Sequence, residues 1–243
     1  MTQTISTTGR QRRAKGTVRF LRDLLVIVLV ALLVSFLVKA YVIRSFWIPS
    51  GSMMNTLQVQ DHVIVDELVP TMIKPRHGDV VVFKDPGGWL RPVGSPAPSG
   101  TGRTTVGTVI GAALGSSDKD DHLVKRVIGL PGDHVACCND FGQMTINGIP
   151  VKEPYLDLPP GESAASKVPF SVTVPAHSLW VMGDNRDNSE DSRFHQNLPS
   201  HGFVPYADVT GRAVVISWPL GRWQWLDDYQ QVFADVEQRQ HDA

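Results

Sequence analysis

Two serines near residue 50 and one lysine in the middle of the chain are the residues best suited to catalysis. The serines flank a glycine in residues 49–54, which read Pro-Ser-Gly-Ser-Met-Met. A serine hydroxyl is a weak nucleophile unless a neighbouring base takes its proton. Lys125 has an aliphatic residue two positions away on either side, so a strand would surround it with apolar groups, and such burial lowers the pKa of an ammonium. We therefore predict that Ser52 is a nucleophile and Lys125 its general base.

A third, densely polar stretch could serve the same site. Residues 183–193 carry acidic, basic, amide and hydroxyl side chains at nearly every position. Such a run is most often a solvated loop, just as a lone Ser-Gly-Ser is most often a turn. Strand alternation turns Arg126 to the face opposite Lys125, where it needs a carboxylate. Residues 183–193 could supply that carboxylate, and also a hydroxyl that orients the lysine.

The elements that must position these residues begin with an apolar segment near the N-terminus. Residues 24–38 contain no charge, and if Lys39 extends toward the interface the span reaches residue 43, about the 20 residues that cross a bilayer. We predict a transmembrane anchor at 23–43 after a basic cytoplasmic tail at 1–22, because basic residues favour the cytoplasmic side. The basic residues before the span are Arg10, Arg12, Arg13, Lys15, Arg19 and Arg22. A cleaved signal peptide and a buried core helix are the alternatives.

The rest of the chain predicts a mainly β structure. Short runs rich in β-branched residues recur at 62–65, 79–83, 123–128 and 209–217, and helical periods are few. Residues 86–121 begin with a stretch rich in Gly, Pro and Ser, which predicts an inserted loop or lobe. We interpret residues 227–243 as a polar C-terminal tail, which could be helical.

Composition narrows the choice of partners and cofactors. The 243 residues carry a net charge of -1, so no overall positive field favours nucleic acid as a partner. The two cysteines, Cys137 and Cys138, are adjacent, and neighbouring strand residues point to opposite faces, so we expect two small, semi-apolar residues rather than a disulfide. His134 is close by, but a fourth metal ligand is not evident. We expect neither a metal nor a cofactor.

Together, the three stretches resemble those of the bacterial type I signal peptidases (leader peptidases), membrane-bound serine endopeptidases with a Ser-Lys dyad. The matching positions, in order, are Ser50-Gly51-Ser52-Met53 with Thr56-Leu57, Asp61 with Val65, Lys125-Arg126-Val127-Ile128-Gly129 with Pro131-Gly132-Asp133, and Gly183-Asp184-Asn185-Arg186 with Asn188-Ser189 and Asp191-Ser192-Arg193. The resemblance covers the apolar segment and most of the chain after it, but neither 86–121 nor the two tails. Asn55 and Gln60 depart from it, since the family most often has proline and glycine at these positions.

The resemblance implies a role for each matching residue. Ser52 would be the nucleophile, and Lys125 the general base and later the acid for the leaving amine. The backbone N–H of Ser52 and the hydroxyl of Ser50 would form the oxyanion hole. Ser189 would hydrogen-bond the lysine nitrogen. The other implied supports of the site are Asp184 as the partner of Arg126, together with Asp191 and Arg193.

The fold that the resemblance implies is a β catalytic core at 44–136 and 179–226, interrupted by a smaller β subdomain at 137–178. The implied substrates are preproteins with signal peptides, cut after small residues of the Ala-X-Ala type and bound as an added β-strand. The protein would then act in a bacterial cell membrane, single-pass, with its N-terminus in the cytoplasm and its catalytic domain outside, near the lipid bilayer. Candidate residues for the substrate pockets are Phe46, Ile48, Met53 and Val65.

Three rival functions remain open. A Ser-His-Asp hydrolase would need one of the eight histidines, but none of them lies in the three stretches. A self-cleaving repressor would share the dyad chemistry, but the apolar segment and the lack of DNA-binding helices argue against it. A non-catalytic, membrane-tethered peptide-binding module would present peptides without cleaving them.

Overall fold

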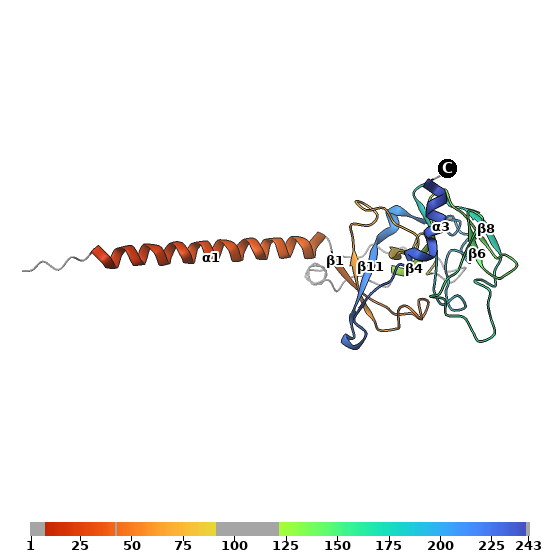
Figure 1. Cartoon of the computed structure of the whole chain (residues 1–243), viewed down its shortest axis with the longest axis horizontal. Helices are drawn as coiled ribbons and strands as arrows, with labels where there is room; N and C mark the ends of the chain where they lie inside the picture. Colours follow the sequence, from red (N-terminus) through yellow and green to blue (C-terminus); the bar gives the residue numbers. More distant parts are fainter. Residues whose placement is uncertain (1–7, 42, 91–121, 242–243) are drawn as a thin grey trace, which may run out of the picture. The chain divides into compact units, whose positions relative to one another are not determined.

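The computed structural model of the protein describes residues 8–41, 43–90 and 122–241 and divides into two compact units, Met1–Ile43 and Arg44–Ala243. The first unit contains the helix α1 (Thr8–Tyr41), drawn in red in Figure 1. No proline or glycine follows Gly16 within it, so its sequence does not interrupt the helix. The helix begins inside the predicted basic tail and includes most of the predicted anchor. Within the described part of the chain, no helix is both long enough and apolar enough to span a membrane.

The larger of two sheets has the strand order β1-β2-β11-β3-β4-β9-β10, and β12 pairs with β11. Its pairings from β2 through to β10 are antiparallel. The elements of this part are β1 (Ile43–Trp47), β2 (His62–Asp66), β3 (Val80–Lys84), β4 (His122–Gly129), β9 (Ser178–Met182), β10 (Val204–Pro205), η1 (Tyr206–Asp208), β11 (Val209–Trp218), η2 (Leu220–Arg222) and β12 (Gln224–Trp225). The mainly β class predicted from the sequence is confirmed.

The smaller sheet has the order β7-β6-β5-β8 and is also antiparallel. Its strands are β5 (His134–Cys137), β6 (Met144–Ile146), β7 (Ile149–Val151) and β8 (Phe170–Thr173). The sheet therefore lies within residues 134–173 and overlaps the subdomain predicted at 137–178. Its first strand, β5, follows β4 after only a short turn, and the subdomain boundaries at 137–178 stay a prediction.

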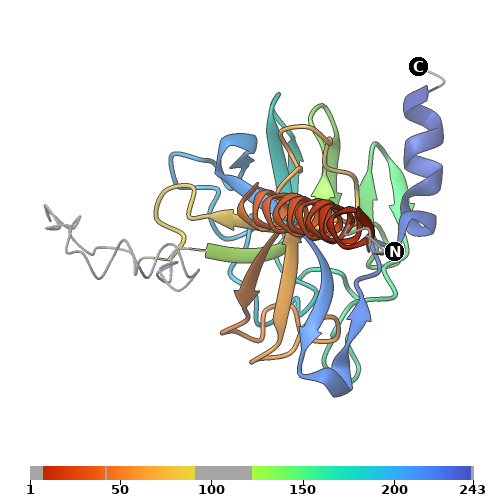
Figure 2. The ribbon, with the colours of Figure 1, turned by 90° about the vertical axis from the view of Figure 1, so that its left-hand side faces the viewer.

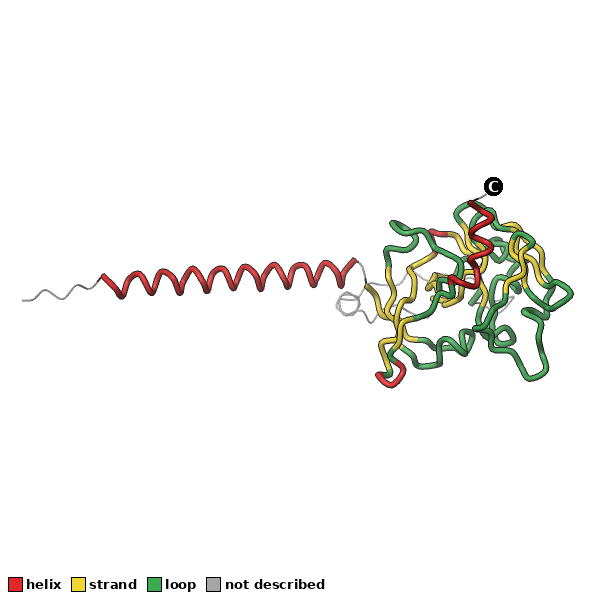
Figure 3. The backbone as a smooth tube through the Cα atoms, in the orientation of Figure 1, coloured by secondary structure: helices red, strands yellow, loops and turns green. Residues whose placement is uncertain are grey.

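The register of the larger sheet holds the strand of Lys125 on both sides. β3 pairs with β4 so that Val81 faces Lys125 and Val80 faces Arg126. On the other side, β9 pairs with β4 from Arg126 onward. The segment after β9, residues 183–203, is a loop, drawn in green in Figure 3. Because this loop leaves β9 directly, the polar stretch begins beside the lysine strand.

The C-terminal segment contains a helix. It forms α3 (Gln230–His241), the blue helix that ends beside the C label in Figure 2. Phe233 and Val236 are buried in the apolar cluster that includes the small sheet. These two residues are three positions apart, which places both side chains on one face of the helix. The tail predicted at 227–243 thus contains a helix with a buried apolar face.

Cys137 and Cys138 form a disulfide, so the expectation of two unpaired residues is wrong. That expectation applied strand alternation to both residues. In the structure β5 ends at Cys137, and Cys138 belongs to the loop that comes next. The alternation rule therefore does not extend to the second cysteine.

Of the insert predicted at 86–121, residues 91–121 lie outside the described part of the chain. The start of the insert is held by Asp85, whose carboxylate accepts hydrogen bonds from the backbone N–H groups of Gly87, Gly88 and Trp89. The Trp89 ring then stacks on His195, with 4.4 Å between ring centroids. The insert therefore begins next to the loop at 183–203.

Candidate active site

Ser52 and Lys125 meet although they are 73 residues apart in sequence. Ser52 lies in the turns between β1 and β2, and Lys125 lies in β4. The distance from Lys125 Nζ to Ser52 Oγ is 2.7 Å, a hydrogen bond. The residues are 3% and 8% exposed, respectively, so the contact is largely shielded from water.

Burial is the main influence on the lysine, and it lowers the pKa of Lys125 from 10.5 to about 8. The Asp191 carboxylate opposes this shift, and the Arg193 guanidinium adds to it. An amine with this pKa is neutral in about half of the molecules near pH 8. A neutral amine at this position can accept the proton of the Ser52 hydroxyl, which is the requirement for a serine nucleophile.

Backbone contacts hold the turn of Ser52 against the polar stretch. The Asn185 N–H donates to the Ser52 carbonyl at 3.2 Å, and the Asn185 side-chain amide donates to the Gly51 carbonyl at 3.2 Å. A Cβ at Gly183 would collide with the Ser52 carbonyl, so this approach requires glycine. The sequence pointed to residues 183–193 for their side chains, whereas the backbone of this stretch also positions the turn.

The second serine lies next to the first. Ser50 Oγ is 3.4 Å from Ser52 Oγ, and Ser50 is exposed. Because Ser50 is exposed and its hydroxyl lies close to Ser52 Oγ, it can donate to an atom bound beside the nucleophile. The structure thus brings together both serines and Lys125, the three residues to which the sequence assigned the chemistry.

Arg126 and Asp184 form a buried bidentate ion pair, with Nε to Oδ1 at 2.9 Å and Nη2 to Oδ2 at 2.7 Å. The Thr56 hydroxyl, from the turn after the serines, also donates to the Asp184 carboxylate. The guanidinium lies over the rings of Tyr155 and Tyr229, at 4.2 Å and 5.2 Å from their centroids. Neither tyrosine was singled out from the sequence, because an aromatic ring that packs on an arginine has no local pattern.

The Asp191 carboxylate accepts several hydrogen bonds from other residues of the polar stretch. It accepts hydrogen bonds from the Ser189 hydroxyl at 2.8 Å, the Gly183 N–H at 3.0 Å and the Arg193 guanidinium at 2.8 Å. Burial raises the pKa of Asp191, but the hydrogen bonds and charge of Arg193 outweigh it and hold that pKa below its usual value. Ser189 binds Asp191 in this structure, and a hydrogen bond from Ser189 to Lys125 stays a prediction.

A second buried ion pair, which sequence reasoning missed, links the polar stretch to the segment after β7. Arg186 Nη2 lies 2.6 Å from Glu153 Oε1, and Arg186 also donates to the Ala165 carbonyl at 2.8 Å. The Tyr155 hydroxyl donates to the same Glu153 oxygen at 2.8 Å. Glu153 lies outside all three stretches, so no signal in the sequence separates it from a surface acid.

The four residues considered for substrate pockets lie together. They belong to one buried apolar cluster, and they are Phe46, Ile48, Met53 and Val65. This cluster lies under the turn of Ser52, because Met53 is part of that turn. Their role in substrate selection stays a prediction.

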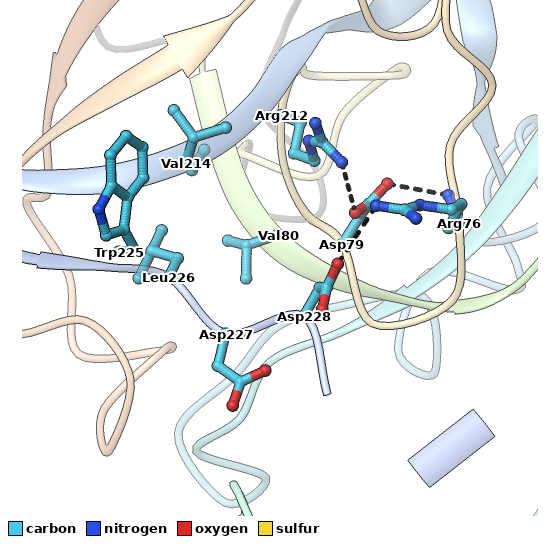
Figure 4. Close-up of a pocket in the computed structure, with 10 residues that line it drawn as sticks. Arg76, Asp79, Val80, Arg212, Val214, Trp225, Leu226, Asp227 and Asp228 are labelled. Carbon is cyan, nitrogen blue, oxygen red and sulfur yellow. Dashed lines mark hydrogen bonds and ion pairs between the residues drawn. The ribbon is translucent and has the colours of Figure 1, made fainter. Parts of the chain in front are cut away.

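A pocket of about 310 Å³ lies elsewhere, between β11, the start of β3 and the segment after β12 (Figure 4). Asp79 accepts hydrogen bonds from the Arg76 N–H at 2.8 Å and from Arg212 at 3.4 Å, and Arg76 also pairs with Asp228. The residues that line this pocket include no residue of the predicted site. Its two arginines are thus each paired with a carboxylate, Arg76 with Asp228 and Arg212 with Asp79.

Neither a metal-binding group nor a histidine base accompanies Ser52 among the described residues. In the part of the chain that the structure describes, no group of three or more His, Cys, Asp and Glu side chains is placed to hold a metal ion. Within the same residues, the hydrogen-bond partners of the Ser52 hydroxyl are Lys125 and Ser50. No described histidine is therefore bonded to this serine.

Comparison with known proteins identifies relatives over most of the chain. The model of the family described as signal peptidase, peptidase S26, matches residues 21–218. Signal peptidase I of Mycobacterium tuberculosis (strain ATCC 25618 / H37Rv) is 37% identical over 233 residues, which cover 89% of this chain and 78% of the relative. Signal peptidase I of Leptolyngbya laminosa is 34% identical over 185 residues, 76% of this chain and 73% of the relative. Signal peptidase I U of Bacillus subtilis (strain 168) is 31% identical over 199 residues, 80% of this chain and 86% of the relative.

Proposed function

This chain belongs to the signal peptidase family, peptidase S26, and we propose that it is a serine endopeptidase that removes N-terminal signal peptides from exported preproteins. The observation that carries the proposal is the buried 2.7 Å hydrogen bond between Lys125 Nζ and Ser52 Oγ. A serine protease without a histidine base needs another group that takes the hydroxyl proton. Ser52 and Lys125 are therefore the proposed catalytic dyad.

In the proposed acylation step, neutral Lys125 takes the Ser52 proton while Oγ attacks the scissile carbonyl carbon. The resulting tetrahedral oxyanion accepts hydrogen bonds from the Ser52 N–H and from the Ser50 hydroxyl, which lies 3.4 Å from Ser52 Oγ. The C–N bond then breaks, and protonated Lys125 gives its proton to the leaving amine. The signal peptide is now an ester on Ser52, and the mature protein is free.

In the proposed deacylation step, the neutral lysine takes a proton from water, which attacks the ester carbonyl. The second tetrahedral intermediate uses the same two donors, and its collapse returns the proton to Ser52 Oγ. The other side chains position the dyad. Arg126 with Asp184 is proposed to support the turn through Thr56, and Asp191 with Arg193 and Ser189 supports the side nearest the lysine.

The proposed substrate segment is extended and ends in small residues of the Ala-X-Ala type. Support comes from the edge of β4. β3 pairs with β4 along Leu123 and Val124, whereas β9 pairs with it only from Arg126 onward. Among the described strands, the second edge of Leu123 and Val124 is therefore open for an added peptide strand beside Lys125. A strand bound there would bring its carbonyl carbon to Ser52.

The proposed location is a bacterial cell membrane, crossed once by residues 23–43 with the N-terminus in the cytoplasm. Support comes from the uncharged run after a basic cluster and from the exposure of its apolar side chains at 24–34 within the first unit. In the second unit, exposed tryptophans suit the lipid interface; they are Trp47, Trp218, Trp223 and Trp225. Alkaline carbonate extraction of cell membranes tests this location, and release of the full chain into the supernatant would refute it.

Cleavage of a preprotein by the purified full chain in detergent tests the catalytic proposal. We expect product ending after the Ala-X-Ala sequence from the wild type and none from Ser52→Ala or Lys125→Ala. Lys125→Arg should also be inactive, because a guanidinium does not lose its proton at workable pH. Ser163→Ala and Lys152→Ala, at exposed positions in the small subdomain region, are matched controls that should cleave normally.

The same assay separates the enzyme from a non-catalytic peptide-binding module. A module would bind the preprotein and leave it intact, and Ser52→Ala would then behave as the wild type does. Such a result would exclude the proposed function. A histidine substitution that abolishes cleavage while Lys125→Ala retains it would instead refute the dyad.

A further inference from the structure

The turn that carries Ser52 is tied to the small subdomain by the side chain of Asn55. The Asn55 amide nitrogen lies 3.1 Å from the carbonyl oxygen of Tyr155, which is 100 residues away in sequence. It lies 3.4 Å from the Leu156 carbonyl. The backbone of Asn55 has a φ of 82°, in the left-handed region that asparagine and glycine tolerate best. This conformation directs the chain through a turn that also aims the amide at the distant backbone.

The same distant segment contacts the loop that holds Ser52, so the hydrogen bonds close a ring. The Asp157 N–H donates to the Asp184 carbonyl at 3.0 Å, and Asp157 forms a bridge with Asn185. The Asn185 N–H in turn donates to the Ser52 carbonyl at 3.2 Å. The ring runs from the turn of Ser52 to Asn185, from there to Asp157, and back to the turn through the contact between Tyr155 and Asn55. The Asn55 amide is the side-chain contact that completes it.

We propose that Asn55 is a positioning residue, whose amide fixes the turn of Ser52 so that Oγ stays within hydrogen-bond reach of Lys125. The proposal rests on the proposed dyad function. Reaction rates depend steeply on the placement of a nucleophile, since displacements of about 1 Å can lower a rate about a hundredfold. Thr56 holds one part of the turn to Asp184, and Asn55 holds another part to Tyr155.

The Asn55 amide does not need the Tyr155 carbonyl to satisfy its hydrogen bonds, because the residue is exposed. Asn55 is exposed, so water could satisfy its amide if the side chain pointed away from Tyr155. This position instead requires two properties of its residue, a left-handed φ and a side-chain hydrogen-bond donor. Glycine meets the first requirement alone, and proline meets neither, because its ring holds φ near about −65°. Aspartate tolerates the conformation but would direct a carboxylate at two carbonyl oxygens.

The chain offers a matched control in Asn147. This residue also has a positive φ, 53°, and its amide donates to Asp133 at 2.8 Å, in a turn of the small sheet away from the turn of Ser52. The side-chain oxygen of Asn147 also accepts a hydrogen bond from the His134 N–H at 2.8 Å. Asn147→Gly therefore removes side-chain hydrogen bonds from the same kind of backbone, and one of them is to the buried Asp133 carboxylate. It reports the general effect of such a loss on stability without changing the ring around Ser52.

The experiment measures kcat and KM of the full chain in detergent on one preprotein. For Asn55→Gly we expect kcat to fall by about threefold to tenfold, the value of one typical hydrogen bond, with KM within about twofold. Asn55→Pro should lower kcat further, and Asn55→Asp should lower it at least as much as glycine does. Asn147→Gly should keep kcat while its melting temperature falls at least as much as that of Asn55→Gly, because it loses a hydrogen bond to a buried carboxylate. Equal kcat in wild type and Asn55→Gly, or a change confined to KM, would overturn the proposal.

Hydrogen exchange of the backbone amides at 51–57 tests the same inference without cleavage. Asn55→Gly should accelerate exchange there, and Asn147→Gly should not. If the wild type cleaves no preprotein, the proposed function fails, whereas the exchange result still decides whether Asn55 holds the turn. Unchanged exchange at 51–57 in Asn55→Gly would refute the tether even in an active enzyme.

Discussion

The titration of Lys125 should limit cleavage on the acid side of the pH profile. Burial holds the pKa of Lys125 at about 8, below the ordinary 10.5. With that pKa, about one tenth of the lysine is neutral near pH 7 and about nine tenths near pH 9. An exposed lysine would be neutral in only about three molecules in ten thousand near pH 7. We therefore expect kcat/KM to rise about tenfold between these two values, with a midpoint near 8.

Removal of the charge of Glu190, near Lys125, should move the acid limb of the pH profile in a predictable direction. The Glu190 carboxylate raises the pKa of Lys125, and its side chain is 83% exposed, so Glu190→Gln removes the charge with little effect on folding. Removal of a group that raises this pKa lowers it, so the acid limb should move to lower pH and cleavage near neutral pH should increase. The shift should shrink at high salt, because exposed charges are screened.

The assay follows cleavage of one preprotein by the full chain in detergent across a buffer series of constant ionic strength. Wild type and Glu190→Gln are compared under the same conditions. A flat profile on the acid side, or a midpoint near the ordinary 10.5 of lysine, would refute the reasoning about burial. Movement of the acid limb to higher pH in Glu190→Gln would refute the assigned sign.

Three further changes test the packing around the dyad. Gly183→Ala should lower kcat by about a hundredfold, because the added Cβ would displace the Ser52 carbonyl, whereas Gly221→Ala meets no atom within 4 Å and should be active in the same cleavage assay. Lys125→Met should raise the free energy of unfolding by about 3 kcal/mol more near pH 7 than above pH 10.5, because the folded-state pKa of the lysine lies below its unfolded-state pKa and the buried charge destabilises the fold below about pH 8. Urea unfolding at both pH values measures this difference, and an equal effect at both would contradict it. Phe233→Ala should lower the free energy of unfolding by about 3 to 5 kcal/mol in the same measurement, because the side chain is fully buried, and no change would contradict the docking of α3.

Strand alternation was informative where the chain is regular. The pattern around Lys125 predicts an apolar face for the lysine and an opposite face for Arg126, and the structure buries both. The same rule failed at Cys138, because the strand had already ended at Cys137. Alternation therefore holds as far as the strand extends, and the end of a short strand depends on pairing with its neighbours.

Side-chain contacts between distant segments left no signal in the sequence. The amide of Asn55 reaches the Tyr155 carbonyl, and Glu153 reaches Arg186, over separations of 100 and 33 residues. Any asparagine or glutamate could make such contacts, so residue type alone does not select these two. The buried face of α3 left little signal for a related reason, since Phe233 and Val236 are few among polar neighbours.

By itself, the sequence determined the mainly β class, the family resemblance and the kinds of residue at the site, because runs of β-branched residues and the order of the three stretches are local properties. Tertiary structure alone decided that Ser52 and Lys125 lie 2.7 Å apart and that both are shielded from water. Desolvation, which lowers the pKa of the lysine, arises only when segments far apart in the chain pack together. The ring that holds the serine turn depends on the same packing, because each of its hydrogen bonds joins a different pair of distant segments.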